Sequence, residues 1–259
     1  MTDLHYDVRG GGPVLLVVPG GAGHPMGLDA LTADLAGRFT VVTYDPLGLA
    51  HGHLGLPVAE QRVEAWSEGA HRVLDQVLPD GESAYVLGFS SGGIAVLDLL
   101  ARHPERLRHV IAHEPPVVRV LPDADRQSAM FAEVRDTYRA AGLAAAGARL
   151  AAGLAGTPAA PSGDGRPPSG QEELGSPMAL FLTRVLTRFT AYAPDLDALR
   201  SAPVTLAAGA DSRGGLLHRT AGVAAELTGG RFAEFPGGHV GAVEHPREFA
   251  ASVVDALLG

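Results

Sequence analysis

Short apolar runs alternate with stretches of helical periodicity along most of this chain. The apolar runs predict strands, which we place at residues 4–8, 13–18, 39–44, 84–89, 107–113, 204–208 and 231–235. Apolar residues at helical spacing predict helices at residues 28–36, 58–78, 91–103, 216–227 and 246–258. Such alternation is typical of βαβ units, so we expect an α/β protein with a mostly parallel sheet and helices on both faces. The first two strands, joined across Gly10–Gly12, are expected to form a hairpin.

The alternation stops between residues 116 and 200. Helical patterns cover 124–152 and 178–192, and a segment rich in Gly and Pro, predicted to be a flexible loop, spans 153–170. We therefore divide the chain into an α/β core, residues 1–115 and 201–259, and a helical cap or lid, residues 116–200, inserted before the penultimate strand. Alternatively, residues 116–200 form a second packing layer that does not control access to an active site.

Length and composition indicate one large domain without a membrane span. The chain has 259 residues, of which 46% are hydrophobic, and its longest apolar runs are far shorter than the about 20 residues that cross a bilayer. The first ten residues, MTDLHYDVRG, contain no apolar signal core. A cytoplasmic protein is expected.

The charged residues narrow the range of partners. A net charge of −9 argues against binding to nucleic acid or to an anionic membrane, so a small-molecule substrate is expected and the oligomeric state stays open. All 20 basic residues are Arg, which, with the high Ala and Gly content, is typical of a GC-rich bacterial genome. The absence of Cys and Lys excludes disulfides, a thiol nucleophile and a Schiff-base lysine.

The segment 84–93, AYVLGFSSGG, carries the clearest chemical signal. A predicted strand leads into Gly88-Phe89-Ser90-Ser91-Gly92, and a predicted helix follows at once. This is G-x-S-x-G in a strand–turn–helix context, where small flanking residues expose the serine hydroxyl on a tight turn. We predict that Ser90 is a catalytic nucleophile; a structural turn that happens to contain Ser is the alternative.

A serine nucleophile needs a base and an acid that orients the base. His239 follows the strand predicted at 231–235, and Asp211 follows the strand predicted at 204–208. The carboxyl ends of parallel strands lie along one edge of a sheet, so these residues can converge on Ser90. Glu114 follows an earlier strand and is the alternative acid; we rank Asp211 first.

No metal or other cofactor is expected. His51 and His53 lie two residues apart without an adjacent acid, which is weak support for a metal site, although either can line a pocket. His71 and His103 fall on predicted helices and are expected on solvated faces. His245 begins the last predicted helix and is expected to be a cap or surface residue.

Two backbone N–H groups are needed to stabilise a tetrahedral intermediate. We assign them to Ser91, which follows the nucleophile, and to Gly21 in the glycine-rich loop after the second strand, with Ala22 as second choice for the latter. His24, Met26 and Phe89 are predicted to line the substrate pocket.

With these elements placed, the chain resembles the α/β-hydrolase fold superfamily. The matching segments are VLLVVPGGAG, FTVVTYDPLGLAHG, YVLGFSSGG, VTLAAGADS and FAEFPGGHVG, in family order and spacing. Two positions depart from the common pattern: Pro19 replaces the His of the oxyanion loop, and Pro46-Leu47-Gly48 replaces Arg-Gly-His. The resemblance implies an active-site serine, an acyl-enzyme and an ester-like substrate. It excludes the relatives that need a carboxylate nucleophile, because Ser90 occupies that position.

Fold alone does not fix the reaction, so three functions stay open. The first is a serine hydrolase that cleaves a carboxylic ester, thioester or lactone of a small to medium apolar molecule. The second keeps the same triad for cyclisation, acyl transfer or carbon–carbon cleavage in secondary metabolism. The third is a ligand-binding protein that has lost turnover.

Overall fold

A single seven-stranded sheet forms the centre of the protein. The computed structural model describes residues 5–23, 27–46, 58–158 and 165–259. The strand order is β1-β3-β2-β4-β5-β6-β7, and every neighbouring pair is parallel except β1 with β3. The strands are β1 (His5–Gly10), β2 (Val14–Val18), β3 (Thr40–Asp45), β4 (Ala84–Phe89), β5 (Leu107–His113), β6 (Val204–Gly209) and β7 (Arg231–Phe235). The α/β fold expected from the sequence is confirmed.

The predicted hairpin between the first two strands is wrong. β1 pairs with β3, from His5 opposite Asp45 to Gly10 opposite Thr40. Gly10 and Gly12 have φ angles of 86° and 111°, and a Cβ on Gly10 would lie 2.4 Å from the carbonyl oxygen of Phe39. The glycine turn therefore passes directly over the start of β3 and leaves β1 on the outer edge of the sheet.

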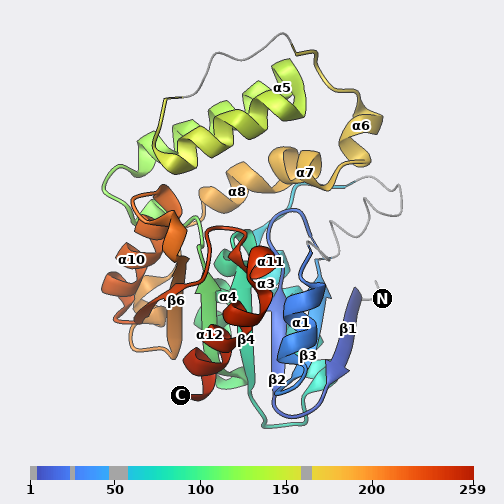
Figure 1. The fold of residues 1–259 in the computed structure, drawn as a ribbon, viewed down its shortest axis with the longest axis vertical. Coiled ribbons are helices and arrows are strands. Elements are labelled where there is room, and N and C mark those ends of the chain that lie inside the picture. The colour runs from blue at the N-terminus through green and yellow to red at the C-terminus, as the bar shows by residue number, and fades with distance from the viewer. Residues whose placement is uncertain (1–4, 24–26, 47–57, 159–164) are drawn as a thin grey trace.

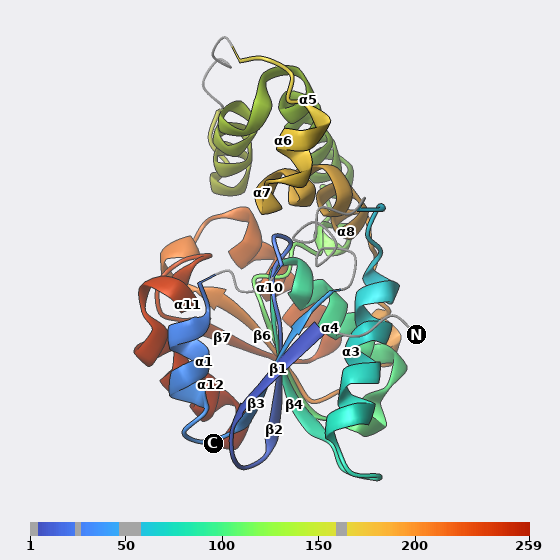
Figure 2. The same cartoon turned by 90° about the vertical axis from the view of Figure 1, so that its right-hand side faces the viewer.

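Helices cover both faces of the sheet, as Figure 2 shows with the sheet seen from its β1 edge. One face carries α1 (Asp29–Leu35) and α12 (Pro246–Leu258), and the other carries α3 (Val63–Val77), α4 (Ser91–Arg102) and α10 (Leu216–Thr228). The side chains of β2 alternate between the two cores, since Leu15 and Val17 join the first and Leu16 and Val18 join the second. Burial on both faces explains why a central strand such as β2, with the sequence VLLVV, is continuously apolar.

A helical insertion, residues 118–199, connects β5 to β6 and lies beyond one end of the sheet (Figures 1 and 2). It consists of α5 (Ala124–Ala155), α6 (Gly170–Leu174), α7 (Pro177–Leu180), a π-helical turn (Phe181–Val185), α8 (Leu186–Thr190) and α9 (Leu196–Leu199), besides a short 3₁₀ turn at its start. Many of its buried side chains form a cluster of their own, which includes Phe131, Tyr138 and Leu182. No helix in the described ranges is both long and apolar enough to span a membrane.

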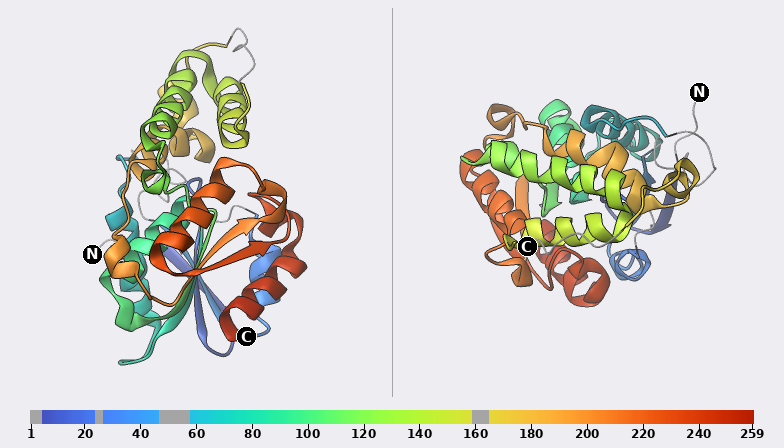
Figure 3. Two further views of the ribbon diagram at one scale, coloured as in Figure 1. Left: turned by 90° about the vertical axis from the view of Figure 1, so that its left-hand side faces the viewer. Right: turned by 90° about the horizontal axis from the view of Figure 1, so that it is seen from above.

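The long helix α5 folds back on itself. Gly142 interrupts it with φ 80° and ψ −170°, and the two halves run side by side above the core (Figure 3). A Cβ on Gly153 would lie 2.4 Å from the sulfur of Met130, so the halves approach closely. The expected loop at 153–170 is shorter than predicted, because α5 continues to Ala155; residues 159–164 lie outside the described part. The division into core and cap domains stays a prediction.

Candidate active site

Ser90 lies on a strained turn between β4 and α4. Its φ and ψ angles are 51° and −115°, a conformation that costs a non-glycine residue on the order of 1–3 kcal/mol. Its backbone N–H donates to the carbonyl oxygen of His113 at 2.9 Å, so the turn is attached to the end of β5. The side chain is half-buried. This is the strand–turn–helix geometry that G-x-S-x-G predicts.

The two glycines of the motif allow close backbone contacts. A Cβ on Gly88 would lie 2.6 Å from the carbonyl oxygen of Gly92, the second residue of α4. A Cβ on Gly92 would lie 2.2 Å from the carbonyl oxygen of Pro19, at the end of β2. Real Cβ contacts are essentially never this short, so glycine at both positions is what lets α4 begin against the β2 loop.

The structure brings His239 and Glu114 together. Nδ1 of His239 lies 2.7 Å from Oε2 of Glu114, although 125 residues separate them in the sequence. Oε1 of Glu114 accepts a hydrogen bond of 2.9 Å from the backbone N–H of Gly209. The two oxygens of one carboxylate therefore connect the β7 loop to the end of β6.

Glu114 is a charged group in a fully buried position. Its relative exposure is 0%, and its φ angle of 46° is unusual for a residue with a side chain. Burial raises the pKa of this carboxyl, but hydrogen bonds from His239 and Ser212 and the field of the two nearby imidazoles outweigh burial and lower the pKa to about 2. Glu114 is therefore ionised at neutral pH and accepts a hydrogen bond from the Nδ1–H group of His239.

Asp211, which we ranked above Glu114 as the acid, occupies a different position. Its side chain is exposed, at the turn after β6, and the described contacts of His239 include no hydrogen bond to it. The backbone N–H of Asp211 donates to the carbonyl oxygen of Gly237 at 3.0 Å. Asp211 thus holds the start of the His239 loop through its main chain, while Glu114 contacts the imidazole.

The predicted oxyanion groups lie where β2 meets α4. Gly20 accepts a hydrogen bond of 3.0 Å from the N–H of Gly23, so Gly21 and Ala22 are the central residues of a tight turn. Ser91 is buried and is the first residue of α4. A Cβ on Gly21 would lie 2.1 Å from the ring of Phe181, so the helical insertion reaches this turn.

The predicted pocket residues are only partly described. His24 and Met26 lie outside the described residues. Phe89 is buried, and its ring packs against His113 and Phe249 with centroids 5.8 Å away in each case. Its side chain thus belongs to the core on the α12 side. A pocket of about 440 Å³ borders the His239 imidazole; its lining includes Glu114, Asp211, Ser212 and Leu154 of the insertion.

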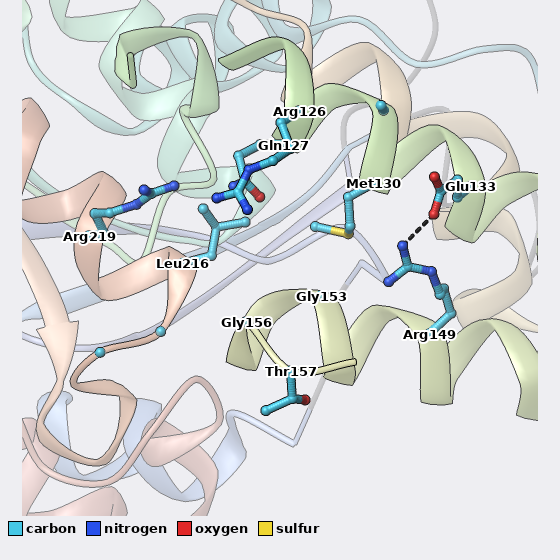
Figure 4. A pocket seen from close by; sticks show the side chains of 13 residues that line it. Arg126, Gln127, Met130, Glu133, Arg149, Gly153, Gly156, Thr157, Leu216 and Arg219 are labelled. Atoms are coloured by element: carbon cyan, nitrogen blue, oxygen red, sulfur yellow. Dashed lines mark hydrogen bonds and ion pairs between the residues drawn. The ribbon is translucent and has the colours of Figure 1, made fainter. Parts of the chain in front are cut away.

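A second pocket, of about 420 Å³, lies between the two halves of α5 and the segment 214–216 of the core (Figure 4). Arg126, Arg149 and Arg219 line it. Arg126 and Arg219 bind Asp123 at 2.7 and 3.0 Å, and Arg149 binds Glu133. Each arginine has a carboxylate partner, although Arg126 and Arg219 share one, Asp123.

His113 is a buried residue for which sequence analysis predicts no role. It is fully buried, and neither ring nitrogen has a hydrogen-bond partner among the described residues. The rings of Phe89, Phe235 and Phe249 surround it with centroids 5.1–6.1 Å away. Burial lowers its pKa to about 4, although neighbouring Glu114 acts in the opposite direction. His113 is neutral at pH 7 and fills space behind Glu114.

The sequence and the fold correspond to a known family. The chain matches the family model for the alpha/beta hydrolase fold over residues 13–246, and it belongs to this family. It is 31% identical over 275 residues to "Uncharacterized hydrolase YraK" of Bacillus subtilis (strain 168), a match that covers 99% of this chain and 93% of that protein. The family and this relative support hydrolase activity.

Two solved structures illustrate the shared fold. A thermophilic esterase from Thermogutta terrifontis superposes with a TM-score of 0.68 at 17% identity, over 98% of this chain and 92% of that one. An enol-lactonase from Burkholderia xenovorans LB400 gives a TM-score of 0.62 at 18% identity, over 99% and 96%. Identities this low establish similarity of fold.

Proposed function

We propose that this protein is a serine hydrolase that cleaves a carboxylic ester, thioester or lactone of a small to medium apolar molecule through an acyl-enzyme. The proposal rests chiefly on the 2.7 Å contact between Nδ1 of His239 and the buried carboxylate of Glu114. Both residues follow strands of the parallel sheet, at the same edge as the strained turn that presents Ser90. Nucleophile, base and acid therefore share one edge of one sheet.

The Glu114 contact defines what His239 can do. Because Glu114 accepts a hydrogen bond from Nδ1–H, the proton of the neutral imidazole stays on Nδ1, and Nε2 is the nitrogen that is free to act as a base. In the proposed reaction Nε2 takes the proton of the Ser90 hydroxyl as Oγ attacks the carbonyl carbon, and then donates it to the leaving oxygen or sulfur. Water activated by the same nitrogen releases the acid and regenerates Ser90.

We assign the orienting acid to Glu114 in place of Asp211. A carboxylate with two defined partners and no exposure holds the imidazole in one orientation and stabilises its charged form. An exposed carboxylate such as that of Asp211 interacts with water instead. We retain for Asp211 a role in anchoring the His239 loop through its backbone.

The oxyanion assignment keeps Ser91 and Gly21. Ser91 stands at the N-terminus of α4, where backbone N–H groups lack partners within the helix. Gly92 holds that terminus against the carbonyl of Pro19, two residues before Gly21. Two N–H donors from these segments are worth about 3–4 kcal/mol each to a developing negative charge.

Two observations support the proposed substrate class: the activities of the fold neighbours and the position of the helical insertion. The fold neighbours include an esterase and an enol-lactonase, and the helical insertion lies over the same edge of the sheet (Figure 1). We propose that the insertion acts as a cap that encloses the apolar part of the substrate. The contact between Phe181 and Gly21 connects the cap to the oxyanion turn.

The test combines turnover with direct detection of the acyl-enzyme. The wild-type protein is expected to hydrolyse a short-chain p-nitrophenyl ester and to react with a fluorophosphonate at Ser90. Ser90→Ala is expected to lose both, while Ser91→Ala, which keeps its backbone N–H, retains both. Mass spectrometry of a quenched reaction should show the added acyl mass on the intact protein and, after proteolysis, on the peptide that contains Ser90. Turnover by folded Ser90→Ala, or labelling at another residue, would contradict the proposal.

A further inference from the structure

Three potential metal ligands converge on the face of the core that α3 and α4 cover. Glu68 and His71 stand one turn apart on α3, and His103 is the residue at which α4 ends. One ligand atom from each of the three lies within 4.8 Å of the other two. The imidazole rings of His71 and His103 are stacked, with centroids 3.7 Å apart and planes 13° from parallel.

We propose that Glu68, His71 and His103 form a binding site for a divalent transition-metal ion such as Zn²⁺. Two imidazole nitrogens and a carboxylate oxygen suit Zn²⁺, Ni²⁺, Co²⁺ and Cu²⁺, whereas Mg²⁺ and Ca²⁺ prefer oxygen ligands alone. The site replaces the expectation that His71 and His103 merely lie on solvated faces. It does not depend on the proposed hydrolase function.

A carboxylate lies behind each imidazole. Oδ2 of Asp75 is 3.6 Å from Nδ1 of His71, and Oε1 of Glu105 is 4.0 Å from Nδ1 of His103. Histidines that bind metals commonly donate their second N–H to a carboxylate, which fixes the tautomer and strengthens the ligand. Both carboxylates lie beyond hydrogen-bond distance, so each would have to move closer to Nδ1 for Nε2 to be the nitrogen that binds the ion.

Asp75 is itself held in place. Its other oxygen, Oδ1, lies 3.2 Å from the guanidinium of Arg106, whose side chain is only 14% exposed. Arg106 also donates to the carbonyl oxygens of Leu74 and Glu82. The group behind His71 is therefore part of a fixed network that joins α3 to the segments on either side of α4.

The three side chains need to move only a short distance to bind a tetrahedral zinc ion. Ligands about 2.0–2.1 Å from a tetrahedral zinc ion lie about 3.4 Å from one another, so each pair needs to close by no more than about 1.4 Å. A metal ion lies near the plane of each imidazole that binds it, so one of the stacked rings must also turn. The His71 and His103 side chains are 19% and 24% exposed, which leaves room on the solvent side.

The site is remote from the proposed catalytic serine. α4 has 12 residues between Ser90 and His103, which corresponds to about 18 Å along the helix axis. An ion at this site would connect α3 to the end of α4 and stabilise their packing. It would not reach the substrate, so ester turnover should be the same with and without it.

The experiment is a titration of chelator-treated full-length protein with Zn²⁺, followed by calorimetry and by the melting temperature. The wild type is expected to bind one ion and to melt at a higher temperature with Zn²⁺ present. Co²⁺ in place of Zn²⁺ is expected to give visible absorption bands from nitrogen and oxygen coordination. Ester hydrolysis is measured in the same samples and should not change.

His71→Phe separates coordination from stacking, because it keeps a ring against His103 but removes the nitrogen ligand. His71→Phe and His103→Ala are each expected to weaken Zn²⁺ binding at least about tenfold, since losing a group behind a ligand already costs about 10- to 100-fold. Glu68→Gln should weaken it less. His5→Ala, which removes an exposed histidine on β1, is the matched control and should bind like the wild type.

Two results would overturn the metal site. One is the absence of stoichiometric binding by the wild type, which would leave the histidine pair as a stacking contact alone. The other is binding that survives both His71→Phe and His103→Ala, or that His5→Ala weakens equally, which would indicate nonspecific surface binding. Circular dichroism establishes folding of each variant, and the two histidine variants act on different helices, so one misfolded protein does not decide the outcome.

Discussion

The proposed catalytic edge of the sheet and the helical insertion differ in how much of their packing is made by side chains. At the edge, main chain packs directly on main chain: a Cβ on Gly92 would lie 2.2 Å from a carbonyl oxygen, and one on Gly209 would lie 2.5 Å from the carbonyl of Gly237. In the insertion, side chains pack on side chains around Phe131 and Tyr138, and a backbone approach of the same kind occurs at Gly165, whose Cβ would lie 2.0 Å from the carbonyl oxygen of Ala141. Gly147, in the second half of α5, has open space where its Cβ would be.

This difference indicates which region tolerates change. Backbone contacts at the edge fix the proposed catalytic groups, so small displacements there should reduce kcat. Side-chain packing in the insertion can be rebuilt with other apolar residues of similar volume. We therefore expect substitutions in the insertion to alter substrate binding, and the following predictions test that division.

The largest expected effect on kcat comes from removing the proposed base, His239. His239→Ala should lower kcat by about 10⁴-fold or more, because members of a triad act as a unit. His245→Ala, six residues further on, removes a histidine at the start of α12 and should change kcat much less. Steady-state kinetics on a p-nitrophenyl ester checks both. Equal losses in the two variants would mean that the loop geometry, and not the imidazole of His239, limits the reaction.

Glycine substitutions compare the two regions directly. Gly92→Ala should destabilise the protein by about 3 kcal/mol or more and abolish turnover, because the new methyl group meets backbone that cannot yield. Gly147→Ala should raise stability by about 0.5–1 kcal/mol and leave turnover intact, since it adds a helix-forming residue in open space. Urea unfolding measures both. If Gly92→Ala were as stable as the wild type, the claim that backbone packing leaves no room for a side chain at Gly92 would be wrong.

The third prediction concerns pH. His113 stays neutral in the folded state down to a pKa of about 4, while in the unfolded chain it takes up a proton below about pH 6.5. The unfolded state binds more protons in that window, so stability falls as pH falls from 6.5 to 4. His113→Phe removes this titrating group, whose two buried nitrogens have no hydrogen-bond partner among the described residues. The free energy of unfolding of the variant, relative to that of the wild type, should therefore rise by about 3 kcal/mol as the pH falls from 6.5 to 4.

Unfolding free energies of wild type and His113→Phe at pH 7, 5.5 and 4 provide the measurement. A constant difference between the two proteins over this range would show that His113 titrates normally. Turnover at pH 7 should change little, because His113 contacts aromatic rings and is not a member of the proposed triad.

The smallest kinetic effect is expected from a substitution in the helical insertion. Phe181→Ala removes the ring that lies against Gly21 and should raise KM several-fold with little change in kcat. Met178→Ala, on α7 and 42% exposed, is the matched control and should change neither constant. A large loss of kcat in Phe181→Ala would show that the insertion positions the oxyanion turn as well as the substrate.

Much of the fold was predictable because the core elements carry local signals. β5, β7 and α12 begin and end where the apolar pattern predicts. The pairing of β1 with β3 was missed because strand order depends on contacts that no local pattern reports. The reversal of α5 at Gly142 was also missed, since a single glycine in an Ala-rich segment is compatible with a continuous helix.

The choice between the two acids was not decidable from sequence. Glu114 and Asp211 both follow strands that end at the same edge, and the distance from each to the imidazole depends on loop geometry. One signal in the sequence favoured Glu114: it is an acid at the end of a strand that contains the apolar run Val110–Ala112, and two prolines that restrict the chain direction follow it. Such a residue is positioned for burial, where a carboxylate needs a partner.

The most direct test of the proposed site compares kcat for Glu114→Gln and Asp211→Asn, two substitutions that keep shape and remove charge. If Glu114 orients His239, Glu114→Gln should lower kcat by about 10³–10⁴-fold, as loss of the corresponding group does in serine proteases, whereas Asp211→Asn should retain most activity because its backbone N–H still holds Gly237. Both variants must show native circular dichroism. A severe loss in Asp211→Asn with a mild one in Glu114→Gln would contradict the account and return the acid to Asp211.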